Sequence, residues 1–291
     1  MKKARQSYIE FPDCWEDLTE ADWRDVLKIR QKVVAHGGRY SELDITTETA
    51  RLLLRNRGVK TQINNPDYIQ LVGQLAKTLG WLWHTEGTTI SLVYRDTHNL
   101  IPKVREWLGP LDHGADLVFG EFRQAFAHLQ NIEHPSGDTP EKCNIFRNTA
   151  MEALAGLLYR PKATVEQKRN MQLRRQPYDW DSLDDKIERG RLMEPWQVWG
   201  IYAWFAWFCE HLTTGTFIID GQEVCFAPLF SHGGTDDTDK GEGGMSQICL
   251  TLAESHVFGT AKDVDRTLLL TVMQKLLMDY RTLQRIKKLK N

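Results

Sequence analysis

The sequence has no excess of charge of either sign. Its 37 Lys and Arg residues are balanced by 39 Asp and Glu residues, which gives a formal net charge of -2 over 291 residues. A nearly neutral chain has no global field to steer it towards nucleic acid or an anionic membrane. With 41% hydrophobic residues the chain also differs from disordered proteins, which combine low hydrophobicity with high net charge. We therefore expect a buried core, in one large domain or two smaller ones.

Cysteine is scarce and lacks the spacing of a metal or redox motif. The five cysteines are Cys14, Cys143, Cys209, Cys225 and Cys249, and no two of them form a C-x-x-C pair. An odd number of widely spread cysteines does not indicate a disulfide framework. We expect reduced, mostly buried thiols in a cytoplasmic protein.

The pattern also lacks an export signal and a membrane span. Residues 1–6 are basic, as in a signal peptide, but charged residues and a proline occupy 8–16, where the apolar stretch would have to lie. The longest uncharged apolar run, 195–209, is shorter than the ~20 residues that a bilayer span needs. We expect a cytoplasmic protein with no membrane partner.

The usual catalytic motifs are absent from the sequence. It contains no phosphate-binding glycine loop, no H-E-x-x-H pair and no G-x-S-x-G elbow. Neither Glu210-His211 nor Glu254-x-His256 places a carboxylate one helical turn from an imidazole. A pairing of Cys209 or Cys249 with a distant histidine stays open, although structural buried cysteine is commoner. We expect no enzyme, and we assign no catalytic, cofactor-binding or metal-binding residue.

Helical periodicity is the main signal that the sequence does contain. Thr19 and Asp22 have the spacing of a capping box before a helix over 20–36, and Thr260 and Asp263 cap a helix over 261–288. Further helices are predicted at 47–56, from Asn65-Pro66 onward, and at 102–107, 118–132, 141–160, 195–212 and 245–258.

Two short segments read as β-hairpins. In the first, around 81–95, Trp81 to Trp83 pairs with a strand after Gly87, and the turn lies at 84–87. The second, around 216–227, turns at Asp220-Gly221. The fold class is therefore mainly α, a multi-helix bundle with one or two small β-hairpins.

Tryptophan is abundant, with ten residues, and four of them crowd one segment. Trp196, Trp199, Trp204 and Trp207 lie in the predicted helix 195–212, which is apolar around its whole circumference. Such a helix belongs either to the core or to an interface with a partner. The core is favoured, and both interpretations stay open.

A charged stretch separates two helical regions. The basic residues are Lys162, Lys168, Arg169, Arg174 and Arg175, and the acidic residues that follow are Asp179, Asp181, Asp184, Asp185 and Glu188. We interpret 161–191 as a solvated, partly mobile connector whose halves attract each other. It divides an N-terminal helical region, 1–160, from a C-terminal helical region, 192–291, which contains a flexible Gly/Asp loop at 231–244.

Two stretches suggest binding chemistry. Residues 159–180 mix cations with the rings of Tyr159, Tyr178 and Trp180, as single-strand nucleic-acid binding does, but the acidic block beside them would repel phosphates. The loop 231–244 offers metal ligands in His232, Asp236, Asp237, Asp239 and Glu242. Counted as an EF-hand from Asp237, however, it has Gly241 at a ligand position and Ile248 at position 12.

Several phrases together resemble a group of uncharacterised proteins from phages and prophages of Bacteroidetes-type bacteria, encoded among tail-morphogenesis genes. The phrases are FPDCWEDLTEADWRDVL (11–27), NLIPKVREWLGPLDHGADLVFGEF (99–122), ALAGLLYRP (153–161), WFAWFCEHL (204–212) and LTLAESHVFGTAKDV (250–264). The segment 39–99 fits this group less well, which makes it a candidate insertion. None of the phrases is a catalytic signature.

The resemblance implies a helical, non-enzymatic tail-assembly or structural protein. Its partner would be a tail protein, such as the tape-measure or a tube protein, held through apolar grooves. The protein would act in the cytoplasm of the bacterial host, with the virion as a second location, and its oligomeric state is left open. Two alternatives remain: a nucleic-acid-associated phage protein using 159–180, and a metal-dependent enzyme using the His232 loop.

Overall fold

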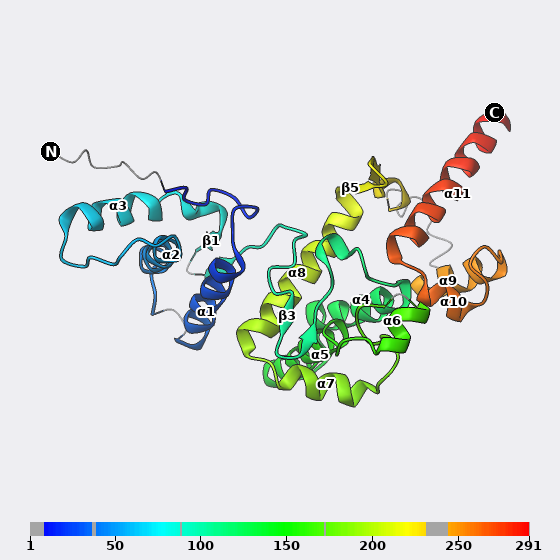
Figure 1. The fold of residues 1–291 in the computed structure, drawn as a ribbon, viewed down its shortest axis with the longest axis horizontal. Coiled ribbons are helices and arrows are strands. Elements are labelled where there is room, and N and C mark those ends of the chain that lie inside the picture. Colours follow the sequence, from blue (N-terminus) through cyan, green and yellow to red (C-terminus); the bar gives the residue numbers. More distant parts are fainter. Residues whose placement is uncertain (1–8, 37–38, 88, 172, 231–243, 291) are drawn as a thin grey trace. The chain divides into compact units, whose positions relative to one another are not determined.

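The computed structural model describes residues 9–36, 39–87, 89–171, 173–230 and 244–290 (Figure 1). The chain divides into two compact units. Unit 1 comprises 1–96 with 195–203, and unit 2 comprises 97–194 with 204–291. The boundaries predicted at 160 and 191 do not coincide with this division. Residues 39–96 belong to unit 1 together with the first helix, and their origin as an insertion remains a prediction.

The described residues are mainly helical, with small antiparallel hairpins, which confirms the predicted fold class. The α-helices are α1 (Glu20–His36), α2 (Glu42–Asn56), α3 (Pro66–Ala76), α4 (Phe119–Glu133), α5 (Pro140–Leu158), α6 (Val165–Met171), α7 (Leu183–Arg191), α8 (Pro195–Thr214), α9 (Gly244–Glu254), α10 (Ala261–Arg266) and α11 (Leu269–Lys290). The strands pair as β1 (Trp83–Glu86) with β2 (Thr89–Leu92), β3 (Lys103–Val104) with β4 (Trp107–Leu108), and β5 (Thr216–Ile219) with β6 (Gln222–Cys225). Short 3-10 helices are η1 (Leu79–Trp81), η2 (Asp112–Gly114) and η3 (Ala227–Leu229).

Unit 1 begins as its capping residues predict. The Asp22 amide donates to Thr19 Oγ1 at 3.2 Å and the Thr19 amide donates to Asp22 Oδ2 at 3.1 Å, which forms the expected capping box of α1. Helix α2 starts at Glu42 and not at 47, because Ser41 and Asp44 form a second capping box that the prediction missed. Trp23 of α1 and Leu53 of α2 are buried in the core.

The first hairpin is present, but its turn lies later than predicted. Trp83 pairs with Leu92 and Glu86 pairs with Thr89, whereas Trp81 belongs to η1. Trp83 is anchored by a buried hydrogen bond from its Nε1 to Thr49 Oγ1 on α2, at 3.0 Å. Gly87 adopts a φ of 60° and so permits the turn after Glu86. The second hairpin turns at Asp220-Gly221 as predicted, with φ of 52° and 74°.

In unit 2, α5 lies between α4 and α7 at the centre of the fold. Leu154, Leu157 and Leu158 of α5 are fully buried. The α5–α7 contact is close because it is made through glycines. A Cβ atom at Gly156 would overlap the carbonyl oxygen of Lys186 on α7, and a Cβ atom at Gly190 would overlap that of Glu152 on α5.

Substitution of Gly156 by Ala should therefore push α5 and α7 apart. We expect a loss of about 1 to 3 kcal/mol in the free energy of unfolding, since a backbone carbonyl cannot move aside. The matched control is Gly73→Ala in α3, where nothing lies within 4 Å of the added Cβ atom. The control should gain about 0.5 to 1 kcal/mol from helix propensity. Denaturant unfolding of both variants checks this, and a stabilised Gly156→Ala protein would contradict it.

The helix predicted at 102–107 is wrong. These residues form the β3–β4 hairpin, in which Lys103 pairs with Leu108 and Val104 with Trp107. Arg105 takes a φ of 52° in the turn. The hairpin extends across the chain, since the Leu108 amide donates to the Arg160 carbonyl at 2.8 Å. This distant backbone pairing outweighs the helical preference of a six-residue segment.

The single helix predicted at 261–288 is also wrong, because it divides into α10 and α11. Its predicted cap is correct, with Thr260 and Asp263 forming a capping box. The break occurs at Thr267, whose backbone is extended. There the Thr267 carbonyl accepts from the Phe119 amide at 2.9 Å, and the Leu269 amide donates to the Leu117 carbonyl at 2.8 Å. Pairing with the segment before α4 thus replaces helical hydrogen bonds.

Two further predictions concern the region after β6. The helix expected at 245–258 is the shorter α9, which ends at Glu254. The predicted flexible loop 231–244 lies outside the described residues except for Gly244, which begins α9. None of the helices in the described parts of the chain has the length and apolar content needed to cross a membrane.

Candidate functional site

Unit 2 contains an apolar groove of about 740 Å³ between α4, α8, α9 and α11. Its volume falls in the range of ligand-binding pockets, ~300 to 1,000 Å³. The residues that line it are Phe119, Phe122, Phe126, Cys209, Leu212, Thr213, Leu229, Phe230, Ile248, Thr251, Leu252, Ser255, Met273, Leu276, Asp279, Tyr280 and Leu283. Asp279 is the one charged residue among these described lining residues.

The groove has a buried floor and an exposed apolar rim. Phe122 and Leu252 on the floor are 2% and 3% exposed, whereas Phe230 and Leu283 on the rim are 43% and 58% exposed. Aromatic packing supports the floor, since the rings of Phe122 and Phe208 meet edge to face with their centres 6.2 Å apart. A rigid apolar floor with exposed apolar edges is typical of a surface that binds an apolar face of a partner.

The sequence predicts helices at these positions but not the groove. Its walls come from four helical segments, 119–126, 209–213, 248–255 and 273–283, and from Leu229 and Phe230. Each stripe alone predicts a core-facing helix. Only tertiary packing reveals that the four apolar faces leave a space between them.

The tryptophan-rich helix α8 contributes residues to both units. Its buried residues pack in the core. In unit 2, Trp204 is 3% exposed and its Nε1 donates to the Thr97 carbonyl at 3.0 Å. In unit 1, the Arg30 guanidinium lies 3.7 Å from the centre of the Trp199 ring. Burial lowers the pKa of Arg30 to about 10. The favoured core interpretation thus fits Trp204, while Trp207 remains half-buried.

The predicted solvated connector 161–191 is wrong for several of its charges. Glu121 of α4 is fully buried and accepts from Arg160 Nη2 at 2.9 Å and from Arg175 Nη1 at 3.0 Å. Asp116 accepts from Arg175 Nε at 3.1 Å and from Arg174 Nη2 at 3.1 Å. These carboxylates lie about 40 to 60 residues earlier in the chain, so the sequence pattern could not pair them with the arginines.

Burial and neighbouring charges shift the pKa values of Arg160 and Asp116 in this ion cluster. Desolvation lowers the pKa of Arg160 to about 10, and the charge of Glu121 opposes that shift. Burial acts to raise the pKa of Asp116, but Arg175, the Leu111 amide and Arg174 together lower it below its usual value. Asp116 and Arg160 are therefore charged at neutral pH, and the ion pairs join Arg160, Arg174 and Arg175 to carboxylates at and just before the start of α4.

The basic and aromatic stretch 159–180 consequently offers less to nucleic acid than its sequence suggests. The rings of Tyr159 and Tyr178 are 1% and 7% exposed, so neither can stack on a base, and Trp180 is 47% exposed. Arg160 and Arg175 are buried in ion pairs. The exposed cations of the stretch are Lys162, Lys168 and Arg169.

His128 of α4 gives unit 2 a pH dependence. Its pKa is lowered by burial and, to a smaller extent, by Lys186. The unfolded chain therefore binds a proton first as the pH falls below about 6.5, and stability is lost from there down to the lower folded pKa. We expect the free energy of unfolding to fall by at most about 1.4 kcal/mol per pH unit in this window. His128→Gln should flatten that slope in urea titrations at several pH values, and an unchanged slope would contradict the assignment.

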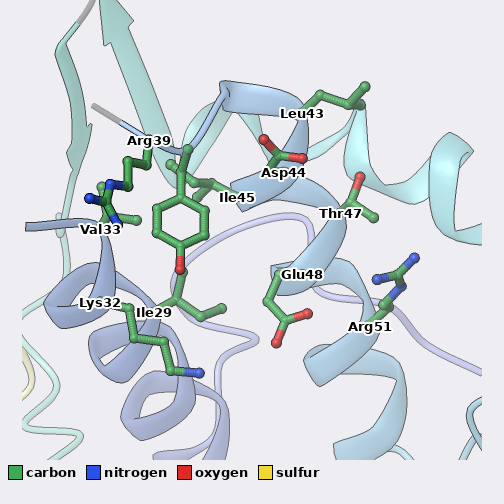
Figure 2. Close-up of a pocket in the computed structure, with 11 residues that line it drawn as sticks. Ile29, Lys32, Val33, Arg39, Leu43, Asp44, Ile45, Thr47, Glu48 and Arg51 are labelled. Carbon is green, nitrogen blue, oxygen red and sulfur yellow. The ribbon is translucent and has the colours of Figure 1, made fainter. Parts of the chain in front are cut away.

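A second cleft, of about 640 Å³, lies in unit 1 between α1 and α2 (Figure 2). Figure 2 shows Ile29 and Lys32 from α1 and Ile45 and Glu48 from α2 as lining residues of this cleft. Its lining mixes charges of both signs.

The loop considered as a metal site lies outside the part of the chain that the structure describes, and one other group of possible ligands is described. His232, Asp236, Asp237, Asp239 and Glu242 lie outside the described residues. Among the described residues, Asp13, Cys14 and Asp17 come close enough together to share an ion. However, partial burial and Glu16 raise the pKa of Cys14 to about 11, so its thiol keeps its proton.

The two cysteines considered as nucleophiles are also protonated thiols. Burial raises the pKa of Cys209 well above its ordinary value, and burial and Asp265 raise that of Cys249. A thiol needs a lowered pKa to act as a nucleophile at neutral pH. Cys209 instead forms part of the apolar wall of the groove.

No family model, curated protein or solved structure matches this chain.

Proposed function

We propose that this chain is a non-enzymatic interaction protein that binds an amphipathic helix of a partner protein in the groove of unit 2. The observation that carries the proposal is the apolar lining of the groove, where Asp279 is the one charged residue among those described. An amphipathic helix laid into an apolar groove is a common mode of protein recognition.

The shape of one wall favours a helix as the occupant. On α11, the lining residues Met273, Leu276, Tyr280 and Leu283 follow one another at intervals of three and four residues. They form a continuous stripe of about 15 Å along the helix axis. A second helix can pack along such a stripe over about three turns.

The resemblance to tail-morphogenesis proteins indicates the class of partner that the groove would bind. We propose a tail-assembly or structural role in which the groove holds a helical tail protein, such as the tape-measure protein or a tube protein. Tape-measure proteins are long and amphipathic, so their helices would need an apolar surface to remain soluble before assembly. The protein would act in the host cytoplasm or in the virion.

Co-expression with the tail proteins that we expect to be encoded beside this chain tests the proposal. We expect one of them to co-purify with the chain and to become more soluble. The absence of both effects for every neighbouring tail protein would refute the tail-assembly role.

Nucleic-acid binding is the weaker alternative, because the rings that would stack are mostly buried. Filter binding at low salt tests it, and we expect no retention of single-stranded DNA or RNA. The metal-dependent alternative depends on the His232 loop, and metal analysis of the purified chain tests it directly.

A further inference from the structure

Helix α11 continues beyond the groove by about two turns. After Leu283, the side chains of Ile286 and Leu289 follow at three-residue intervals and are 44% and 87% exposed. Figure 1 shows the last turns of α11 extending past α9 and α10. We call residues 281–289 the α11 tail. Ile286 and Leu289 turn progressively away from the groove side of α11, whereas Lys287, four residues after Leu283 and seven after Tyr280, lies on that side. The tail therefore prolongs the groove side of α11 with a cation.

The α11 tail is strongly basic. It carries Arg281, Arg285, Lys287 and Lys288, and the sequence contains no Asp or Glu after Asp279. The helix dipole favours cations only within the last turn, so it accounts for Lys287 and Lys288 but not for Arg281. No ion pair within the described parts of the chain involves these four cations.

We infer that the groove and the α11 tail together select an amphipathic helix whose apolar stripe is flanked by acidic side chains. The inference depends on the proposed function and adds the partner's charge. Apolar contacts in the groove supply most of the affinity, while the tail attracts the acidic flank and sets the register.

Charge complementarity distinguishes this occupant from the others. A second copy of the chain would bring one basic tail against another, which is unfavourable. The sequence of 231–243, which follows the rim residue Phe230, contains no large apolar side chain that would match an apolar groove. A lipid surface would use the basic tail, but it would leave the concave groove without a matching apolar ridge.

Three synthetic helices of about 20 residues test the inference. They share one leucine stripe and carry Glu, Gln or Lys on its flanks, and their binding to the full chain is measured by fluorescence anisotropy. At about 0.05 M salt we expect the Glu peptide to bind about tenfold more tightly than the Gln peptide, and the Lys peptide to bind most weakly. The difference should shrink at about 0.5 M salt, because exposed charges are then screened.

A variant without the tail cations tests whether they cause the preference for the acidic peptide. Arg281→Gln, Arg285→Gln, Lys287→Gln and Lys288→Gln in one protein should reduce the affinity for the Glu peptide to that for the Gln peptide. The matched control replaces the exposed cations Lys103, Lys162, Lys168 and Arg169 by Gln, with the same change in net charge. The control should retain the preference for the acidic peptide.

The peptide measurements distinguish charge selection by the α11 tail from helix binding by the groove. Equal binding of all three peptides, still weakened by substitution of Leu283, would overturn the inference and leave the groove as a helix-binding site. Binding of none of them would overturn both. Binding to phosphatidylserine vesicles that displaces the Glu peptide would assign the tail to lipid and overturn the inference as well.

Discussion

Replacement of Glu121 by Gln should lower the free energy of unfolding by about 3 to 5 kcal/mol. Gln keeps the size of the side chain but removes the charge that faces Arg160 and Arg175, which are 4% and 3% exposed. Arg175 would retain Asp116, whereas Arg160 would lose its carboxylate partner in a nearly dry environment. Breaking a buried pair is costly because one charge remains desolvated and unpaired.

The control for this variant is Asp138→Asn, which removes the exposed pair with Lys142. The Asp138 side chain is 73% exposed, and such pairs contribute only about 0 to 1 kcal/mol. Urea unfolding of both variants at pH 7 makes the comparison. A Glu121→Gln protein as stable as Asp138→Asn would show that the buried ion cluster is not a structural anchor of unit 2.

Substitution of the exposed groove wall should abolish partner binding without unfolding the protein. Leu283 is 58% exposed and Leu276 is half-buried, and both lie on the groove stripe of α11. Leu276→Gln with Leu283→Gln keeps good helix formers in α11 but places two polar groups against the partner's apolar face. We expect at least about a 100-fold loss of affinity for the Glu-flanked peptide, or about 2.7 kcal/mol.

The matched control for the groove variant is Ile145→Gln on α5. Ile145 is an apolar residue of a unit 2 helix, is 66% exposed and does not line the groove. Circular dichroism should show both proteins folded, and the control should bind as the unmodified chain does. Equal binding by the groove variant would place the peptide elsewhere on the molecule.

Local patterns in the sequence predicted most of the secondary structure. The Thr19–Asp22 and Thr260–Asp263 capping boxes and the Asp220-Gly221 turn act within a few residues, so they could be read directly. Errors arose where distant backbone segments pair. The hairpin at 103–108 bonds with Arg160, and the break at Thr267 pairs with Phe119.

The charged stretch was misread for a related reason. The spacing of Arg174 and Arg175 indicates a basic surface, but Asp116 and Glu121 from the region of α4 neutralise them in the folded chain. The groove also depends on tertiary packing, since its apolar walls come from segments far apart in sequence. Local propensity can therefore predict helices and caps, while binding surfaces require the assembled fold.

Photo-crosslinking tests directly whether the partner helix binds in the groove of unit 2. A photoreactive residue on the leucine stripe of the Glu-flanked peptide, followed by mass spectrometry of the full chain, identifies the residues that face the partner's apolar side. We expect crosslinks to groove residues such as Phe126, Leu276 and Leu283. Crosslinks confined to unit 1, or to residues of α6 and α7 in unit 2, would contradict it.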